Sequence, residues 1–364
     1  RHLRVPSEET QHWLDFCRNK GWLMPSAGVL TLEGGLKGIP ITDSAPKDDD
    51  DCWGGNIIFN ARGLTRGPEH WSDRLSKETR TKISHLLPKS YEMQGDILIV
   101  KIDEEIIEYS QQIARAMLDQ FPSTRLVCAD KGVKGNFRVR DLLPIVSRDG
   151  NTTTRTKIKE NGKSIWTDPA KVYFSARLSN ERIQTLVSAK DLRIELNRKI
   201  RVCDPYAGVG PGIIPLFFEE DLISHCYAGD LNPDAFELLE LNLQELIISK
   251  NKQTGVDLVL KNQDARIWKN ESENINKVDF LLVNLPHDSI SHLPELLPLL
   301  AKGSVTKIRG WAIIDRDELG HSKIQIEEIL KSANSEIISV HCSEVKGFSS
   351  TKIFMRFETK QIIA

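Results

Sequence analysis

A glycine-bearing segment between residues 204 and 211 has the composition of a ligand-binding bend. It is Asp204-Pro-Tyr-Ala-Gly208-Val-Gly210-Pro211, and it directly follows an apolar stretch that predicts a strand. Glycines at a strand-to-helix turn leave backbone amides bare, because no Cβ blocks the approach of a ligand. A Gly-x-Gly pair alone is weak evidence. Since no lysine follows it, the segment is not a phosphate-binding loop of the Gly-Lys-Ser/Thr type.

Polar residues follow three further predicted strands and give this bend a set of partners. Asp230 ends the second strand, where a carboxylate can accept hydrogen bonds from both hydroxyls of a ribose. Asp264 follows the third strand and is placed to accept from an adenine amino group. Asn284-Leu-Pro286 ends the fourth strand, at the carboxyl edge where open α/β sheets bind ligands. Matches at four successive strand ends predict a nucleotide-type cofactor.

The elements that position these residues alternate regularly from Lys199 onward. Predicted strands cover 199–203, 225–229, 256–260, 278–283, 310–315, 336–341 and 352–357, and predicted helices cover 211–220, 232–248, 292–301 and 322–333. This alternation predicts an α/β fold with a parallel, doubly wound sheet. Only ten residues separate the last two strands, too few for a helical crossover, so we expect the last strand to return antiparallel. Such a sheet is typical of Rossmann-like S-adenosylmethionine methyltransferases.

Two predicted regions precede the sheet domain, which we expect to span residues 168–364. We expect residues 1–72 to form a small domain plus linker, with a helix over 8–20 that ends at Gly21. Residues 73–167 predict an α+β domain. Its expected elements are strands over 96–102, 124–129, 139–146, 154–160 and 163–167 and a helix opened by Asp103, with Asn161-Gly162 as the tight turn of the last hairpin.

Basic residues are concentrated in one stretch of this second domain. Residues 131–163 hold nine Lys or Arg against three Asp or Glu, in a chain whose formal net charge is −2. Concentrated cations suit a phosphate backbone, because each one placed on a phosphate releases condensed counterions. The same stretch is equally compatible with a solvated hairpin that keeps its charges for solubility.

Composition excludes several classes of protein. The 364 residues are 40% hydrophobic and 27% charged, which is a globular balance, and no apolar run approaches the length of about 18 residues of a spanning helix. The start of the chain has no apolar stretch, so we expect no secretory signal. Six scattered cysteines without a Cys-x-x-Cys pair favour a reducing cytoplasm and argue against a cysteine-ligated zinc. We predict a cytoplasmic protein without metal ligands.

Three segments together resemble the archaeal and eukaryotic tRNA (guanine-N1)-methyltransferases that act on guanosine 37. They are the bend at 204–211, Asn284-Leu-Pro286, and Lys171-Val-Tyr-Phe-Ser-Ala-Arg-Leu-Ser-Asn-Glu-Arg182, with Gly135-Asn-Phe-Arg-Val-Arg140 upstream. The Tyr-Phe-Ser-x-Arg-x-x-x-Glu element is the most specific, because it has no generic role in this fold. The resemblance covers roughly residues 84–357, and residues 1–72 fit the family's small tRNA-binding domain more loosely. It implies methyl transfer from S-adenosylmethionine to N1 of guanosine 37 in the tRNA anticodon loop.

The resemblance also implies a role for each matching residue. Glu181 would take the proton of guanine N1, and Arg138 would donate to O6, with Arg140 as the alternative. Tyr173 would stack on the extruded base, and Asn284 would hydrogen-bond the guanine edge. The implied cofactor-binding residues are Asp204, Tyr206, Gly208, Gly210, Asp230, Asp264, Asn284 and Pro286, and the implied substrate-binding residues are Arg140, Arg177, Lys131 and Lys134.

The chain departs from the family's usual pattern at several positions. Ala176 stands where the family usually has Pro, and Gly212 where it usually has an aromatic residue. The segments His287-Asp288 and Arg309-Gly310-Trp311 also match poorly. These departures concern the edge of the substrate site more than cofactor binding.

Other functions fit the same residues. One is a wyosine-pathway transferase that moves an aminocarboxypropyl or a methyl group onto a modified guanosine 37. Relatives that transfer the aminocarboxypropyl group lack the Asn-Leu-Pro strand end kept at residues 284–286. Another is a catalytically silent tRNA-binding module, against which the retention of Glu181, Asp230 and Asn284 argues. We expect a monomer with tRNA as its partner and no membrane association.

Overall fold

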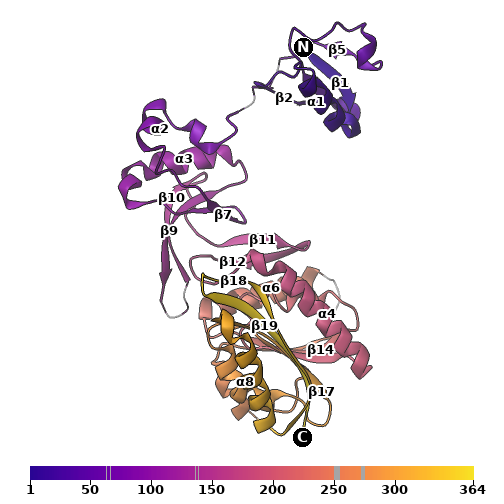
Figure 1. The fold of residues 1–364 in the computed structure, drawn as a ribbon, viewed down its shortest axis with the longest axis vertical. Helices are drawn as coiled ribbons and strands as arrows, with labels where there is room; N and C mark the ends of the chain where they lie inside the picture. Colours follow the sequence, from indigo (N-terminus) through magenta and orange to yellow (C-terminus); the bar gives the residue numbers. More distant parts are fainter. Residues whose placement is uncertain (63, 66, 136, 138, 250–254, 272–274) are drawn as a thin grey trace. The chain divides into compact units, whose positions relative to one another are not determined.

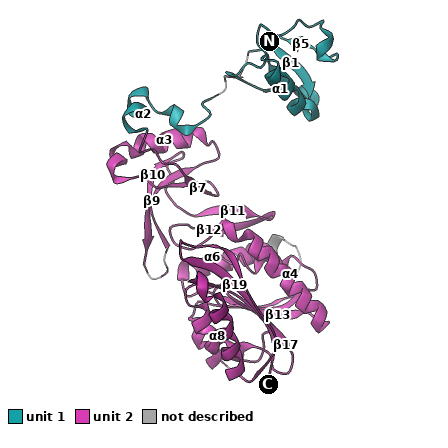
Figure 2. Ribbon diagram, viewed as in Figure 1, with its two compact units in different colours: residues 1–84 teal, residues 85–364 magenta. Residues whose placement is uncertain are grey.

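The structure, a computed structural model, describes residues 1–364 apart from residues 63, 66, 136, 138, 250–254 and 272–274. It divides into two compact units, residues 1–84 and residues 85–364 (Figures 1 and 2). Each unit has its own sheets and its own apolar core. The division into three domains, 1–72, 73–167 and 168–364, stays a prediction.

Unit 1–84 is built on a four-stranded antiparallel sheet against which one helix packs. In the order β3-β4-β1-β5 the strands are Leu30–Thr31, Leu36–Pro40, His2–Pro6 and Ile58–Phe59. Helix α1, Thr10–Asn19, buries Trp13 and Cys17 in the core of this sheet. The helix predicted over 8–20 is therefore confirmed, and Gly21 follows it with a φ of 72°. The remaining elements are β2 (Ala27–Gly28), β6 (Leu64–Thr65), α2 (Lys77–Ile83) and 3-10 turns at Ser7–Glu9, Glu33–Gly35, Asp51–Trp53 and Trp71–Arg74.

The first sheet of unit 85–364 has four strands and is covered by α3, Ser110–Gln120. In the order β10-β9-β8-β7 the strands are Val139–Ser147, Leu126–Lys134, Ile97–Val100 and Tyr91–Gln94. The hairpin of β11 (Thr156–Glu160) and β12 (Lys163–Thr167) follows. Its turn residues Asn161 and Gly162 have φ values of 48° and 74°, which is the left-handed backbone that the predicted tight turn requires. These predicted strands are confirmed, and β7 was missed.

A seven-stranded sheet forms the rest of this unit (Figure 1). In the order β15-β14-β13-β16-β17-β19-β18 its strands are Asp257–Lys261, Ile223–Gly229, Ile200–Asp204, Phe280–Val283, Val305–Asp315, Lys352–Ile363 and Ser335–Gly347. Strand β19 runs antiparallel to both of its neighbours, and the other pairings are parallel. The expected antiparallel last strand is confirmed.

Helices cover both faces of this sheet. α4 (Ser179–Leu196), α5 (Ile214–Phe217) and α6 (Pro233–Ser249) contribute to one apolar core, and α7 (Ser289–Leu296) and α8 (Leu319–Ser332) contribute to the other. Further 3-10 turns are Glu104–Tyr109, Ala176–Leu178, Ala265–Asn270, Leu297–Leu299 and Arg316–Glu318. In the part of the chain that the structure describes, none of the helices is long and apolar enough to span a membrane.

The helix predicted over 211–220 is wrong in its extent. Only the four residues of α5, 214–217, are α-helical, between turns on either side. Pro215 lies in the first turn of α5, and a proline is accommodated there but not in a helix interior. Asp221, with a φ of 57°, lies outside helical geometry on the far side. The cofactor bend is consequently followed by an irregular turn.

Candidate active site

The 204–212 bend leaves β13 at the carboxyl edge of the seven-stranded sheet. Gly208 and Gly210 have φ values of 57° and 89°, a backbone that favours glycine. A Cβ on Gly210 would lie 2.8 Å from Cδ1 of Leu239 in α6, whereas a Cβ on Gly208 would meet nothing within 4 Å. Gly210 therefore lets the bend pack on α6, and Gly208 borders open space.

Asp230, at the end of β14, braces this bend. Its Oδ2 accepts a hydrogen bond of 2.8 Å from the Gly208 amide, and its Oδ1 accepts one of 2.9 Å from the Asn232 amide. Burial raises the pKa of Asp230 above its usual range. The Leu231 amide is a further donor to this carboxylate, which has about four acceptor positions, so one position remains for a ribose hydroxyl.

Asp204, at the start of the bend, is deeply buried, with 3% of the residue exposed. Its Oδ1 accepts from the Tyr206 amide at 3.3 Å. Burial raises the pKa of Asp204 to about 7, and the negative charge of Asp230 adds to this effect. A cationic ligand in the pocket would favour the ionised form of this group.

Tyr206 and Asp264 lie at the same edge of the sheet and have partners within the protein. The Tyr206 hydroxyl is 2.8 Å from Nδ1 of His292 in α7, and burial raises the pKa of this hydroxyl. Asp264 caps the 3-10 turn that follows β15 and forms an ion pair of 2.6 Å with Arg266, which lowers the pKa of the carboxyl. An adenine contact of Asp264 stays a prediction.

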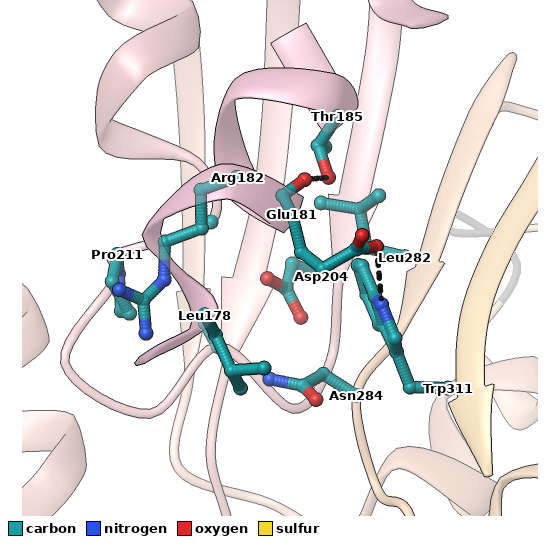
Figure 3. Close-up of a pocket in the computed structure, with 11 residues that line it drawn as sticks. Leu178, Glu181, Arg182, Thr185, Asp204, Pro211, Leu282, Asn284 and Trp311 are labelled. Atoms are coloured by element: carbon teal, nitrogen blue, oxygen red, sulfur yellow. Dashed lines mark hydrogen bonds between the residues drawn. The ribbon is translucent and has the colours of Figure 1, made fainter. Parts of the chain in front are cut away.

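A pocket opens between the bend and the start of α4 (Figure 3). Its cavity volume is about 30 Å³, so the pocket is a small opening at the end of the sheet. Asp204 and Asn284 reach it from strand ends, while Glu181 and Arg182 reach it from the first turn of α4. The full lining is Leu178, Glu181, Arg182, Thr185, Asp204, Ala207, Pro211, Gly212, Leu282, Asn284 and Trp311. Residues predicted from separate motifs thus share one cavity.

Glu181 is buried and is held by donors from the sheet. Only 6% of the residue is exposed. Its Oε2 accepts from Trp311 Nε1 at 2.9 Å and from Arg309 Nη2 at 3.3 Å, and its Oε1 accepts from Arg356 Nη1 at 3.3 Å. Glu181 is therefore a buried residue at the start of α4 and not part of an exposed helix turn.

Sequence reasoning missed these three donors. Arg309 and Trp311 belong to a segment that matched the resembling family poorly, and Arg356 was not considered. The strand predicted over 310–315 begins after Arg309, whereas β17 begins at Val305. With the longer strand, an arginine inside an apolar segment would have indicated a buried anion as its partner.

The segment before α4 is held by Arg182. Its Nη1 forms a buried ion pair with Glu160 of β11, and its Nη2 donates to the Ser175 carbonyl at 2.9 Å. Its guanidinium also lies over the Phe174 ring, 4.7 Å from the centroid. These contacts leave Tyr173 exposed, with 67% of the residue accessible.

Several predicted substrate-binding residues lie outside the pocket lining. Arg138 lies outside the described residues. Arg140 forms an ion pair of 2.5 Å with Glu92 of β7, and Lys134 forms one of 2.6 Å with Asp141. Lys131 and Arg177 are exposed. Pro286 is a backbone partner, since its carbonyl accepts from the Ile313 amide at 2.7 Å.

Much of the basic stretch makes internal contacts. Arg148 donates to the carbonyls of Leu118 and Thr124, while Arg155 and Lys157 pair with Glu237 and Glu245 of α6. The count of charges along the sequence therefore overstated the cations available to a nucleic acid. Within the described residues, no cluster of three or more His, Cys, Asp or Glu side chains could hold a metal ion.

Comparisons with known proteins point to one family. A family model described as the TRM5/TYW2 methyltransferase domain matches residues 156–338, and one described as the TYW2 N-terminal domain matches residues 71–150. The tRNA (guanine(37)-N(1))-methyltransferase Trm5b of Methanocaldococcus jannaschii is 32% identical over 289 residues, which is 76% of each chain. Trm5b of Pyrococcus abyssi is 31% identical over 63% of this chain and 62% of its own length. The chain thus spans less than two thirds of this second relative.

Solved structures share the fold. Wild-type Trm5b from P. abyssi matches with a TM-score of 0.63 and 23% identity over 100% of this chain and 99% of its own. The complex of aTrm5 with tRNALeu matches with a TM-score of 0.63 and 24% identity over 99% of both chains. TYW2 from Pyrococcus horikoshii in complex with MeSAdo matches with a TM-score of 0.64 and 18% identity over 81% of this chain and 98% of its own.

Proposed function

The chain belongs to the TRM5/TYW2 methyltransferase family, and we propose that it transfers a methyl group from S-adenosylmethionine to N1 of guanosine 37 in tRNA. One observation carries the proposal. Glu181, Asp204 and Asn284, which come from three separate motifs, line a single pocket beside the glycine-bearing bend. This arrangement supports a cofactor seat next to a hydrogen-bonding site for a base.

The cofactor seat fits S-adenosylmethionine on two observations. The space beside Gly208 is open where a Cβ would stand, and a buried carboxyl group, Asp204, lies at the end of β13 next to it. When bound, the cofactor supplies an electrophilic methyl group on a sulfonium. Asp230 would hold the ribose, and Asp204 would favour the cationic end of the ligand.

The acceptor side has residues for an extruded purine. Guanine N1 carries a proton at neutral pH, so Glu181 would accept this proton as N1 is methylated. Asn284 offers an amide that can both donate to and accept from the guanine edge. Tyr173 is exposed and available for stacking on a base that has left the anticodon-loop stack. The O6 donor stays the predicted Arg138, with Arg140 as its alternative.

A second function is favoured by one observation. Residues 71–150 match a TYW2 N-terminal domain, so transfer onto a modified guanosine 37 in the wyosine pathway is the other candidate. The Asn284-Leu-Pro286 strand end, which resembles the guanine-N1 enzymes, supports methyl transfer instead. The two candidates share the cofactor and differ in the guanosine that accepts the group, and for aminocarboxypropyl transfer they also differ in the group that is moved.

Product analysis separates them. Unmodified tRNA transcripts with G or A at position 37 are incubated with the full chain and S-adenosylmethionine labelled either in the methyl or in the aminocarboxypropyl group, and the nucleosides are analysed by mass spectrometry. We expect methyl label in N1-methylguanosine from the G37 transcript and none from the A37 transcript. Aminocarboxypropyl label in the RNA, or methyl label that is independent of G37, contradicts the proposal.

A further inference from the structure

The carboxylate of Glu181 is surrounded by donors from two neighbouring strands. Trp311 and Arg309 lie on β17, and Arg356 lies on β19. Trp311 is the register partner of Arg356, and Arg309 is the register partner of Glu358. The donors therefore belong to two residue pairs of one antiparallel ladder, with the Gly310–Phe357 pair between them, and they contact the first turn of α4.

The contacts between Glu181 and its donors are largely shielded from water. The side chain of Arg309 is 4% exposed and that of Glu181 is 8% exposed, while Arg356 is 30% exposed. Arg309 is fixed a second time by an ion pair with Glu358. Hydrogen bonds to an ionised group are stronger than neutral ones, and a low-dielectric surrounding strengthens them further. A rotation of the Glu181 side chain would leave buried donors without their acceptor.

The three bonds leave room for one more. A carboxylate has about four acceptor positions, and the donors described above occupy two on Oε2 and one on Oε1. The position that remains is on Oε1. Because Glu181 lines the pocket together with Asn284, a base N–H that enters the pocket is the natural donor for this position.

The rest of α4 is attached to the same two strands by similar contacts. One and two heptads after Glu181, the Ser188 carbonyl accepts from Lys307 at 3.4 Å, and Glu195 pairs with Lys360 at 2.5 Å. Two other charged residues, Asp204 and Arg182, line the same pocket as Glu181. The guanidinium of Arg182 forms its ion pair with Glu160. Glu181, Ser188 and Glu195 thus form a polar row that attaches α4 to β17 and β19. Within this row, the contacts to the Glu181 carboxylate come from Trp311, Arg309 and Arg356.

We propose that Trp311, Arg309 and Arg356 are positioning residues that hold the Glu181 carboxylate in the one orientation that accepts the guanine N1 proton. The inference rests on the proposed function. It differs from a purely structural role of the polar row, because Lys307 and Lys360 would share such a role and have no contact with the carboxylate.

Trp311→Phe tests the inference with little change in packing. It removes the Nε1–H donor and keeps an aromatic ring in the cluster with Leu178 and Phe354. We expect the single-turnover rate of methyl transfer to fall about tenfold or more, because a hydrogen bond that orients a charged group in the active site is lost. The Kd values for S-adenosylhomocysteine and for tRNA should stay at wild-type values, and the variant should remain folded at the assay temperature although the lost hydrogen bond lowers its stability. Arg356→Gln is a second variant, on a partly exposed residue, with the same expectation.

A double-mutant cycle with Glu181→Gln separates positioning from structure. If Trp311 acts through Glu181, Trp311→Phe should slow Glu181→Gln by less than twofold, because the group that it positions is already lost. Lys360→Gln is the matched control on the same strand and helix, and its rate should stay within twofold of wild type.

The outcomes distinguish the two proposals. A wild-type chain that binds tRNA without methylating G37 overturns both the function and the inference. An active wild type with an unchanged rate in Trp311→Phe and in Arg356→Gln overturns the positioning role alone. Fully additive effects of Trp311→Phe and Glu181→Gln, or an equal loss in Lys360→Gln, also overturn it.

Discussion

Two buried carboxyl groups of the site, Asp204 and Glu181, differ in the partners that surround them. Glu181 accepts from two guanidinium groups and an indole, whereas the bond described for Asp204 comes from a backbone amide. Burial without a cationic partner raises the pKa of Asp204 to about 7. The two groups are therefore suited to different tasks: Glu181 to a fixed orientation, and Asp204 to a charge that responds to a ligand.

Cofactor affinity should depend on pH through Asp204. A cationic ligand prefers the ionised carboxyl, so binding of S-adenosylmethionine must lower the Asp204 pKa and release a proton. With a pKa of about 7 in the free protein, affinity should rise about tenfold from pH 6 to pH 8 and level off above that. Calorimetry in buffers of different ionisation enthalpy measures both the affinity and the released proton.

Asp204→Asn is the control for this pH dependence. The amide keeps an oxygen for the Tyr206 N–H but carries no charge, so its affinity should be lower and should not rise between pH 6 and pH 8. Asp230 also faces the site, and burial raises its pKa as well. A rise that persists in Asp204→Asn would assign the effect to Asp230 and contradict the role given to Asp204.

The site residues that could be predicted from the sequence are those that belong to a short local motif. Asp204, Asp230 and Asn284 each end a strand, and their common sheet edge follows from the α/β alternation. The partners of Glu181 could not be found this way. Arg309 and Arg356 lie 128 and 175 residues from it, and their contacts depend on the register between β17 and β19. No short-range pattern encodes that register.

At the scale of elements, the sheet was predicted better than the helices. Strand existence and the antiparallel return of β19 follow from apolar runs and from the length of one loop. The long helix α4 was not delimited, because the side of it that meets β17 and β19 includes the charged residues Glu181 and Glu195 instead of an apolar stripe. The charged contacts that anchor α4 join it to strands far along the chain, so the local sequence does not reveal them.

Gly310→Ala tests how β17 and β19 support the site. A Cβ at Gly310 would stand 2.2 Å from Cζ of Phe357, the register partner across the ladder. The ring must move, which we expect to cost about 1–3 kcal/mol of unfolding free energy. Because Gly310 lies between Arg309 and Trp311, methyl transfer should slow as well. Denaturant unfolding and single-turnover rates measure the two effects.

Gly320→Ala is the matched control in α8. A Cβ at Gly320 would meet nothing within 4 Å, so the same substitution should stabilise the helix by about 0.5–1 kcal/mol and leave transfer unchanged. A Gly310→Ala variant as stable as Gly320→Ala would contradict the packing described for Phe357.

At the scale of the whole molecule, the pocket and all of its described supports belong to unit 85–364. Unit 1–84 has a separate sheet and a separate core. A tRNA-binding role for residues 1–72 was implied by the resemblance alone and stays a prediction. The internal pairing of the basic stretch leaves fewer cations of residues 131–163 available to a nucleic acid.

Seating of S-adenosylmethionine on the 204–212 bend is tested most directly by calorimetric titration of S-adenosylhomocysteine into the full chain and into Gly208→Ala. The added methyl enters the open space beside the bend, at a cost of about 1 kcal/mol for the left-handed backbone. We predict saturable binding by the wild type and a Kd at least about tenfold weaker in the folded variant. No heat with the wild type, or equal Kd values in the two proteins, would contradict the account.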